Sequence, residues 1–182
     1  MAELHVFGQI VGAKDFQDHC LSCKWTLRTS SNWKVVEGLT EGQTQVDHPQ
    51  VEDAAYWSHP IDIHMIATGL QGWPKLDFEV WRQDFYGRTF LASYGFTHIP
   101  SEPGFHRLEC HTWKPVGNFR DQVYAMFEAG SLRLEDNDAV YDGTNRYRLR
   151  TEASGKVIVE LYVITRNFER FGVNTRTQWY ES

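Results

Sequence analysis

The stretch YGFTHIPSEPGFHRLECHTWKP, residues 94–115, contains two alternating segments separated by a turn. In the second segment Leu108 and Cys110 alternate with polar residues, which is the period-two pattern of a strand with one buried face. The segment IPSEPG, residues 99–104, has the Pro, Ser and Gly that are typical of turns. The stretch therefore predicts a strand, a short turn and a second strand.

The same alternation recurs along the chain, and each apolar set predicts one core-facing strand face. The predicted inward sets are Leu4, Val6, Gly8 and Ile10; Cys23, Trp25, Leu27 and Thr29; Ile61, Ile63, Met65 and Ala67; Leu76, Phe78 and Val80; Phe90, Ala92, Tyr94 and Phe96; and Val157, Val159, Leu161 and Val163. Turn composition marks residues 37–43, 68–75 and 152–156. Because helical crossovers are missing between these segments, the predicted fold class is all-β, an antiparallel β-sandwich.

One short helix is predicted in NFRDQVYAMFEAG, residues 118–130. Its apolar residues fall on one helical face, Asn118 can cap the start and Gly130 can end it. The acidic stretch 134–143 predicts a loop, and residues 174–182 predict a short C-terminal tail.

The composition excludes several classes of protein. The chain has 182 residues, which suits one domain, and 41% of them are hydrophobic, which argues against disorder. The formal net charge of -6 disfavours a general nucleic-acid binder. No apolar run approaches the ~18 residues of a membrane span, and the N-terminal segment lacks the pattern of a signal peptide. The expectation is a protein made in the cytosol.

The three cysteines raise the question of catalysis or metal binding. Cys20 and Cys23 form a C-x-x-C spacing, and Cys110 stands beside His111. A redox pair normally opens a helix, a zinc site needs four ligands, and a nucleophilic Cys needs a positioned base. Here the cysteines belong to predicted strands, so buried, inert thiols and surface histidines are favoured. We predict no catalytic, cofactor-binding or metal-binding residues.

Two surfaces are candidates for binding. Arg146, Arg148 and Arg150 recur at every second residue, so on a strand their guanidinium groups share one face. That face could hold acidic lipid headgroups or a partner's carboxylates, and the alternative is a solvated edge strand guarded by charge.

The second candidate surface is formed by turns. Ser101 and Glu102 lie in the 99–104 turn, whose two prolines restrict its conformation before any partner arrives. Trp73 lies in another Gly/Pro turn, where burial of its ring is less assured. These three residues are the predicted partner interface, and the alternative is a pair of ordinary loops.

Several motifs, in order, resemble the B9 domain family. They are GQTQVDHPQ (42–50), AYWSHPIDIH (55–64), GLQGWPKLDFEVWRQDFYGR (69–88), YGFTHIP (94–100), PGFHRLECHTWKP (103–115) and RNFERFG (166–172). The resemblance runs from residue 2 to 173 and implies one B9 domain there, with residues 174–182 as the tail. It implies a C2-like antiparallel β-sandwich, and the family has no known catalytic activity or cofactor.

The resemblance also implies a biological role. B9-domain proteins, among them B9 domain-containing protein 1 and Meckel syndrome protein 1, assemble with one another at the basal body and transition zone of the cilium. A scaffold subunit of that complex would be cytoplasmic and associated with the cytoskeleton. It would be needed for cilium assembly and for the gate that controls entry of membrane proteins. The alternative function is a calcium-independent, C2-like module that binds anionic lipid.

The C2-like comparison raises the question of calcium. Asp15, Asp18 and Asp84 follow predicted strands, as the ligands of calcium-binding C2 domains do. Three carboxylates are few for an ion that takes about six or more oxygen ligands, and Arg82 stands where a further carboxylate is expected. We predict no calcium-dependent membrane binding.

Overall fold

A computed structural model describes residues 2–49, 54–116 and 150–173 of the chain. The described residues form nine strands and one short 3-10 helix. They are β1 (Ala2–Lys14), β2 (Leu21–Arg28), β3 (Trp33–Gly38), β4 (Glu41–Gln43), β5 (Ala54–Ala67), β6 (Lys75–Gln83), β7 (Thr89–His98), β8 (Gly104–Pro115), β9 (Thr151–Arg166) and η1 (Phe168–Phe171). The predicted all-β class is confirmed.

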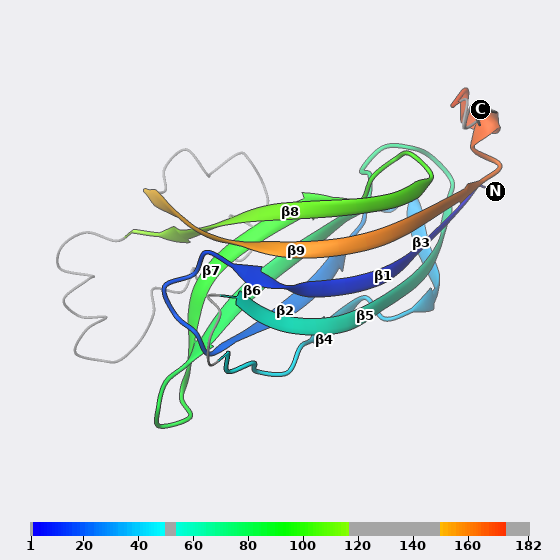
Figure 1. Cartoon of the computed structure of the whole chain (residues 1–182). Helices are drawn as coiled ribbons and strands as arrows, with labels where there is room; N and C mark the ends of the chain where they lie inside the picture. Colours follow the sequence, from blue (N-terminus) through cyan, green and yellow to red (C-terminus); the bar gives the residue numbers. More distant parts are fainter. Residues whose placement is uncertain (1, 50–53, 117–149, 174–182) are drawn as a thin grey trace, which may run out of the picture.

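The strands form a sheet in the order β3-β5-β1-β9-β8-β7-β6-β2-β4, and every pairing is antiparallel. The pairing of β7 with β8 is limited to Tyr94 opposite Trp113, whereas β8 and β9 pair along most of their length. Figure 1 shows β8, β9, β1 and β5 side by side, with β7, β6 and β2 behind them. The sheet curls so that its two halves face each other as the layers of a sandwich.

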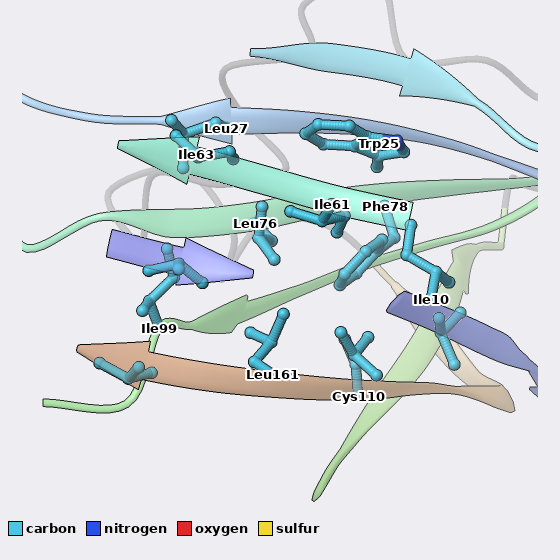
Figure 2. Packing of buried hydrophobic residues seen from close by; sticks show 14 of the residues in the cluster. Ile10, Trp25, Leu27, Ile61, Ile63, Leu76, Phe78, Ile99, Cys110 and Leu161 are labelled. Atoms are coloured by element: carbon cyan, nitrogen blue, oxygen red, sulfur yellow. The ribbon is translucent and has the colours of Figure 1, made fainter. Parts of the chain in front are cut away.

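The core fills the space between the two layers. Five of the six predicted inward sets supply its buried residues, and Figure 2 shows side chains from β1, β2, β5, β6, β8 and β9 meeting there. Leu76 and Phe78 of β6 are fully buried, as are Ile63 of β5 and Leu161 of β9. The alternation therefore predicts the buried face of these strands correctly, except at Thr29, which is exposed and lies beyond the end of β2.

The predicted inward set on β7 is wrong in part, because Ala92 packs against the main core whereas Tyr94 does not. The set consists of Phe90, Ala92, Tyr94 and Phe96. The pairing of β6 with β7 shifts register, because Val80 pairs with Ser93 whereas Trp81 pairs with Leu91. Beyond the shift, Gly95 pairs with inward Phe78, so Tyr94 lies on the opposite face and packs with Leu91 and Trp113 in a second cluster.

The turn predicted at residues 152–156 is also wrong, because this segment lies within β9. Its glycine serves a close approach rather than a turn. A Cβ atom on Gly155 would lie 2.2 Å from the ring of Phe16 and 2.5 Å from the carbonyl oxygen of Lys14. Only glycine leaves room for both neighbours without a shift of the chain. Residues 37–43 are also predicted as a turn. The structure assigns Glu37 and Gly38 to the end of β3 and residues 41–43 to β4.

The helix predicted over residues 118–130, the acidic loop at 134–143 and the tail at 174–182 lie outside the described residues. Within the described part, η1 follows β9, and Phe168 at its start is buried. No helix in the described part of the chain is both long and apolar enough to cross a membrane.

Candidate interaction surfaces

The 99–104 turn is held in place from several sides. Ile99 is buried in the core, and its backbone N–H donates to the carbonyl of Pro74 at 3.1 Å. A ring nitrogen of His106 lies 2.8 Å from the carbonyl oxygen of Glu102. The side chains of Ser101 and Glu102 are exposed between these anchors. The predicted interface residues therefore stand on a turn whose conformation is ordered in the free chain.

Trp73, the third predicted interface residue, lies beneath this turn. Its indole N–H donates to the carbonyl oxygen of Ile99 at 2.6 Å. Its ring is half-buried against Trp33, at 5.0 Å between ring centroids, and Phe168, at 6.1 Å. Trp73 thus supports the turn that presents Ser101, and little of its ring is free for a partner.

The predicted arginine row is described only in part. Arg146 and Arg148 lie outside the described residues. Arg150 is exposed, and its carbonyl oxygen accepts a hydrogen bond from the N–H of Val116 at 2.7 Å. The prediction that three guanidinium groups share a face stays a prediction.

The carboxylates predicted as candidate calcium ligands each face a cation. Asp15 lies 3.5 Å from the Lys156 ammonium, and Asp18 lies 3.6 Å from the Arg82 guanidinium. Asp84 pairs with Arg88 at 2.7 Å. A calcium ion would have to compete with a positive group at every one of these carboxylates. These three carboxylates, as the described part of the chain places them, do not fit a calcium site.

Asp84 also organises the hairpin between β6 and β7. Its carboxylate accepts hydrogen bonds from the backbone N–H groups of Tyr86 and Arg88, both at 2.9 Å, and from the Arg88 guanidinium. Desolvation raises the pKa of the Asp84 carboxyl, but the hydrogen bonds and charge of Arg88 outweigh it and lower the pKa below 3.8. This stabilisation is present above pH 3.8 and is lost as the pH falls through the lowered value.

We expect calcium titration to produce no binding heat. The physical reason is that Arg82, Arg88 and Lys156 already neutralise the carboxylates a calcium ion would need. Isothermal calorimetry up to about 1 mM calcium checks this, since C2-type and sensor sites bind in the micromolar range or somewhat above it. A saturable heat with micromolar affinity would contradict it.

Two of the three thiols are shielded as predicted. Cys23 and Cys110 are buried in the core. Burial, with smaller contributions from Cys110 and Glu79, raises the pKa of Cys23 well above its usual value. Burial, and then the charge of Asp77, raises the pKa of Cys110 to about 12. His111 on β8 is exposed and its neighbour's thiol points into the core, so the two do not form a nucleophile and base.

Cys20 differs from the prediction of a buried thiol. It is partly exposed, and its sulfur lies 2.9 Å from Nδ1 of His48. An isolated β-bridge between Leu21 and Asp47 brings these distant segments together and places His48 opposite Cys20. Cys23, by contrast, faces the core, so the C-x-x-C pair does not act as a dithiol.

We expect iodoacetamide at about pH 8 to label Cys20 at least about tenfold faster than Cys23 or Cys110, because alkylation requires an accessible thiolate. Peptide mass spectrometry of the folded protein measures the three rates. In urea the three rates should converge. Equal labelling of all three thiols in the folded protein would contradict the burial of Cys23 and Cys110.

One surface was missed by the sequence analysis. Phe7 of β1, Tyr162 of β9 and Phe105 of β8 lie side by side on the sheet face that points away from the core. The ring centroids of Phe7 and Tyr162 are 5.3 Å apart, and those of Phe105 and Tyr162 are 4.9 Å apart. The sequence contains one signal that could have indicated this surface, namely an aromatic residue at an outward position of an alternating strand. Phe7 is such a residue, because its neighbours Val6 and Gly8 belong to the predicted inward set.

Sequence comparison with known proteins gives matches over almost the whole chain. Residues 4–164 match the family model B9-C2, described as "Ciliary basal body-associated, B9 protein". B9 domain-containing protein 2 of Xenopus laevis is 54% identical over 175 residues, which cover 96% of this chain and 99% of that protein. The human protein of the same name is 53% identical over 173 residues, covering 95% and 99%. Among solved structures, the C2A domain of plant Extended Synaptotagmin 1 matches with a TM-score of 0.45 and 14% identity, over 91% of this chain and 96% of that domain. The match to the family model and the identity to full-length relatives show that the chain belongs to the B9 family of ciliary basal body-associated proteins.

Proposed function

We propose that this chain is a non-enzymatic scaffold subunit of the complex that B9-domain proteins form with Meckel syndrome protein 1 at the ciliary transition zone. In this role it is needed for cilium assembly and for gating the entry of membrane proteins into the cilium. The observation that carries the proposal is the match to B9 domain-containing protein 2 along 96% of this chain. The B9 domain spans residues 2–173, and residues 174–182 form its tail.

The described structure supports a scaffold rather than a catalyst. The carboxylates of Asp15, Asp18 and Asp84 are each paired with a cation, and two of its three thiols are buried in the core. Its ordered turn at 99–104 presents Ser101 and Glu102 without further folding. A preformed surface loses little conformational entropy on binding, which favours stable assembly.

Co-expression with B9 domain-containing protein 1 and Meckel syndrome protein 1 tests the proposal. Size-exclusion chromatography with light scattering should give a complex of defined stoichiometry. A chain that stays monomeric in the presence of both partners would overturn the scaffold function. Sedimentation with vesicles containing phosphoinositide then tests the alternative of calcium-independent lipid binding through the Arg146, Arg148 and Arg150 row, which high salt should abolish.

The Ser101→Arg substitution should weaken partner binding at least about tenfold, because a long cation in a packed contact adds both bulk and an unpaired charge. Ser101 is exposed, so the melting temperature should stay near that of the wild type. Pull-down and thermal melting measure the two effects. Thr89→Arg, at an exposed position at the start of β7, is the matched control. Unchanged partner capture by Ser101→Arg would remove this turn from the interface.

A further inference from the structure

Four apolar side chains form a continuous exposed patch on the outer face of the sheet. We call Phe7, Phe105, Tyr162 and Ile164 the aromatic face. Their exposed fractions are 36%, 52%, 48% and 52%. The strands that carry them, β8, β9 and β1, are hydrogen-bonded neighbours and run side by side in Figure 1. The patch therefore spans three adjacent strands instead of being scattered over the surface.

The aromatic face is not part of the core. The residues beside it in sequence, Val6, Leu161 and Val163, point to the other side of the sheet and are fully or almost fully buried. At about 200 Å² for a large apolar side chain, the exposed fractions leave roughly 400 Å² of apolar surface. Patches of about this size on a monomer often mark an interaction site.

The charged residues that the structure describes beside the aromatic face have partners within the chain. Arg107 of β8 lies 3.1 Å from Glu160 of β9, which flanks one side of the patch. On the other side Arg166 lies 3.7 Å from Glu3. On β5, Asp62 stands opposite Phe7 and lies 2.7 Å from a ring nitrogen of His5.

These ion pairs indicate which class of ligand can bind to the aromatic face. Lipid phosphates, nucleic acids and acidic peptides bind to clusters of cations that are free to meet them, whereas the two arginines described at this rim, Arg107 and Arg166, each lie against a carboxylate. The net charge of -6 further disfavours an anionic membrane. An apolar centre with a polar rim is the composition of a protein–protein interface. The occupant is therefore a protein surface with an apolar centre.

The position and the area of the aromatic face further restrict which protein can bind there. Phe105 follows Gly104 directly, so the aromatic face is continuous with the 99–104 turn of the proposed interface. A patch of roughly 400 Å² is about half of what one partner contributes to a standard interface, and the turn and polar rim can supply the remainder. Obligate homodimer interfaces are larger and more apolar than this, which disfavours a second copy of the chain.

We propose that the aromatic face docks against the outer sheet face of another B9-domain chain. The inference rests on the proposed scaffold function and names the surface that performs it. Members of a family share a fold, so a B9-domain partner has a sheet of the same architecture, and two sheet faces pack at about 10 Å separation. The three rings supply the buried aromatic anchors of the contact.

The test uses the variant Phe7→Thr/Tyr162→Thr, because threonine keeps strand propensity while removing both rings. In the co-expression experiment this variant should bind the B9-domain partners at least about tenfold more weakly than the wild type. The matched control is Phe85→Thr/Tyr86→Thr at the β6–β7 hairpin, where the side chains are 98% and 81% exposed. The control should bind normally.

The outcomes separate this inference from the proposed function. If the wild type binds neither partner, the scaffold function fails and the inference falls with it. If the wild type binds and the Phe7/Tyr162 variant binds equally well, only the inference is overturned. Two further outcomes would also overturn the inference, because each identifies a different occupant. One is a wild-type homodimer that the variant does not form, and the other is sedimentation of the wild type with neutral vesicles that the variant does not show.

A second measurement needs no variant, in case the substitutions unfold the chain. Hydroxyl-radical footprinting of the wild-type complex should show Phe7, Phe105 and Tyr162 protected relative to the free chain. Phe85 and Tyr86 should stay labelled to the same extent in both states. Equal labelling of Tyr162 in the free and bound chain would overturn the inference.

Discussion

The Phe78→Ala variant should lose about 3–5 kcal/mol of the free energy of unfolding, a large share of the roughly 5–15 kcal/mol that stabilises a domain. Phe78 is fully buried and its ring lies between the two layers, as Figure 2 shows. It stands on β6, which pairs with both β2 and β7, so a cavity there weakens contacts of several strands. Urea denaturation followed by tryptophan fluorescence measures the loss.

The control for this prediction is Phe85→Ala in the neighbouring hairpin. Phe85 is 98% exposed, so removing its ring leaves no cavity and should change stability by less than about 0.5 kcal/mol. A Phe78→Ala variant as stable as the control would mean that the layers can collapse onto the vacated space.

The Gly12→Ala variant should lose about 3 kcal/mol, because the added methyl group has no free space. A Cβ atom at Gly12 would lie 1.9 Å from the carbonyl oxygen of Ala55, which is backbone and cannot rotate away. Gly12 also follows the register shift of β1 against both β5 and β9. Relief of the clash requires β1 to separate from β5. The expected loss in the free energy of unfolding therefore lies at the upper end of the range observed for overpacked sites.

Gly69→Ala is the matched control for this second prediction. The nearest atom to a Cβ at Gly69 belongs to the Asn32 side chain at 3.4 Å, which is at the edge of ordinary contact. Its stability should stay within about 0.5 kcal/mol of the wild type. Thermal or urea unfolding of both variants checks the comparison, and a Gly12→Ala variant that is equally stable would refute the close approach of β1 and β5.

Local alternation was sufficient for most strands because it reports which side of a strand meets the core. The inward sets of β1, β2, β5, β6 and β9 follow from it directly. It failed at Tyr94 on β7, because the register shift between Leu91 and Ser93 moves this residue to the other face. A shift of this kind depends on the partner strand, so it leaves no period-two signal in either segment.

The candidate surfaces depended on contacts between distant residues. The Gly/Pro turn around Trp73 leaves the burial of its ring undecided, and it is Trp33 and Phe168, far away in the sequence, that half-bury the ring. Likewise, the pairing of Asp15 with Lys156 and of Cys20 with His48 joins segments that only the sheet topology brings together. Neither pairing has a short-range pattern by which it could be recognised.

The order of residues was enough to establish an all-β antiparallel fold and membership of the B9 family, because strand periodicity and family motifs are local properties of the chain. The curling of the sheet, the neutralised carboxylates and the aromatic face came from the tertiary structure alone. The aromatic face shows the reason most clearly. Phe7 and Tyr162 are 155 residues apart in the sequence and become stacked neighbours only when β1 pairs with β9 in one particular register.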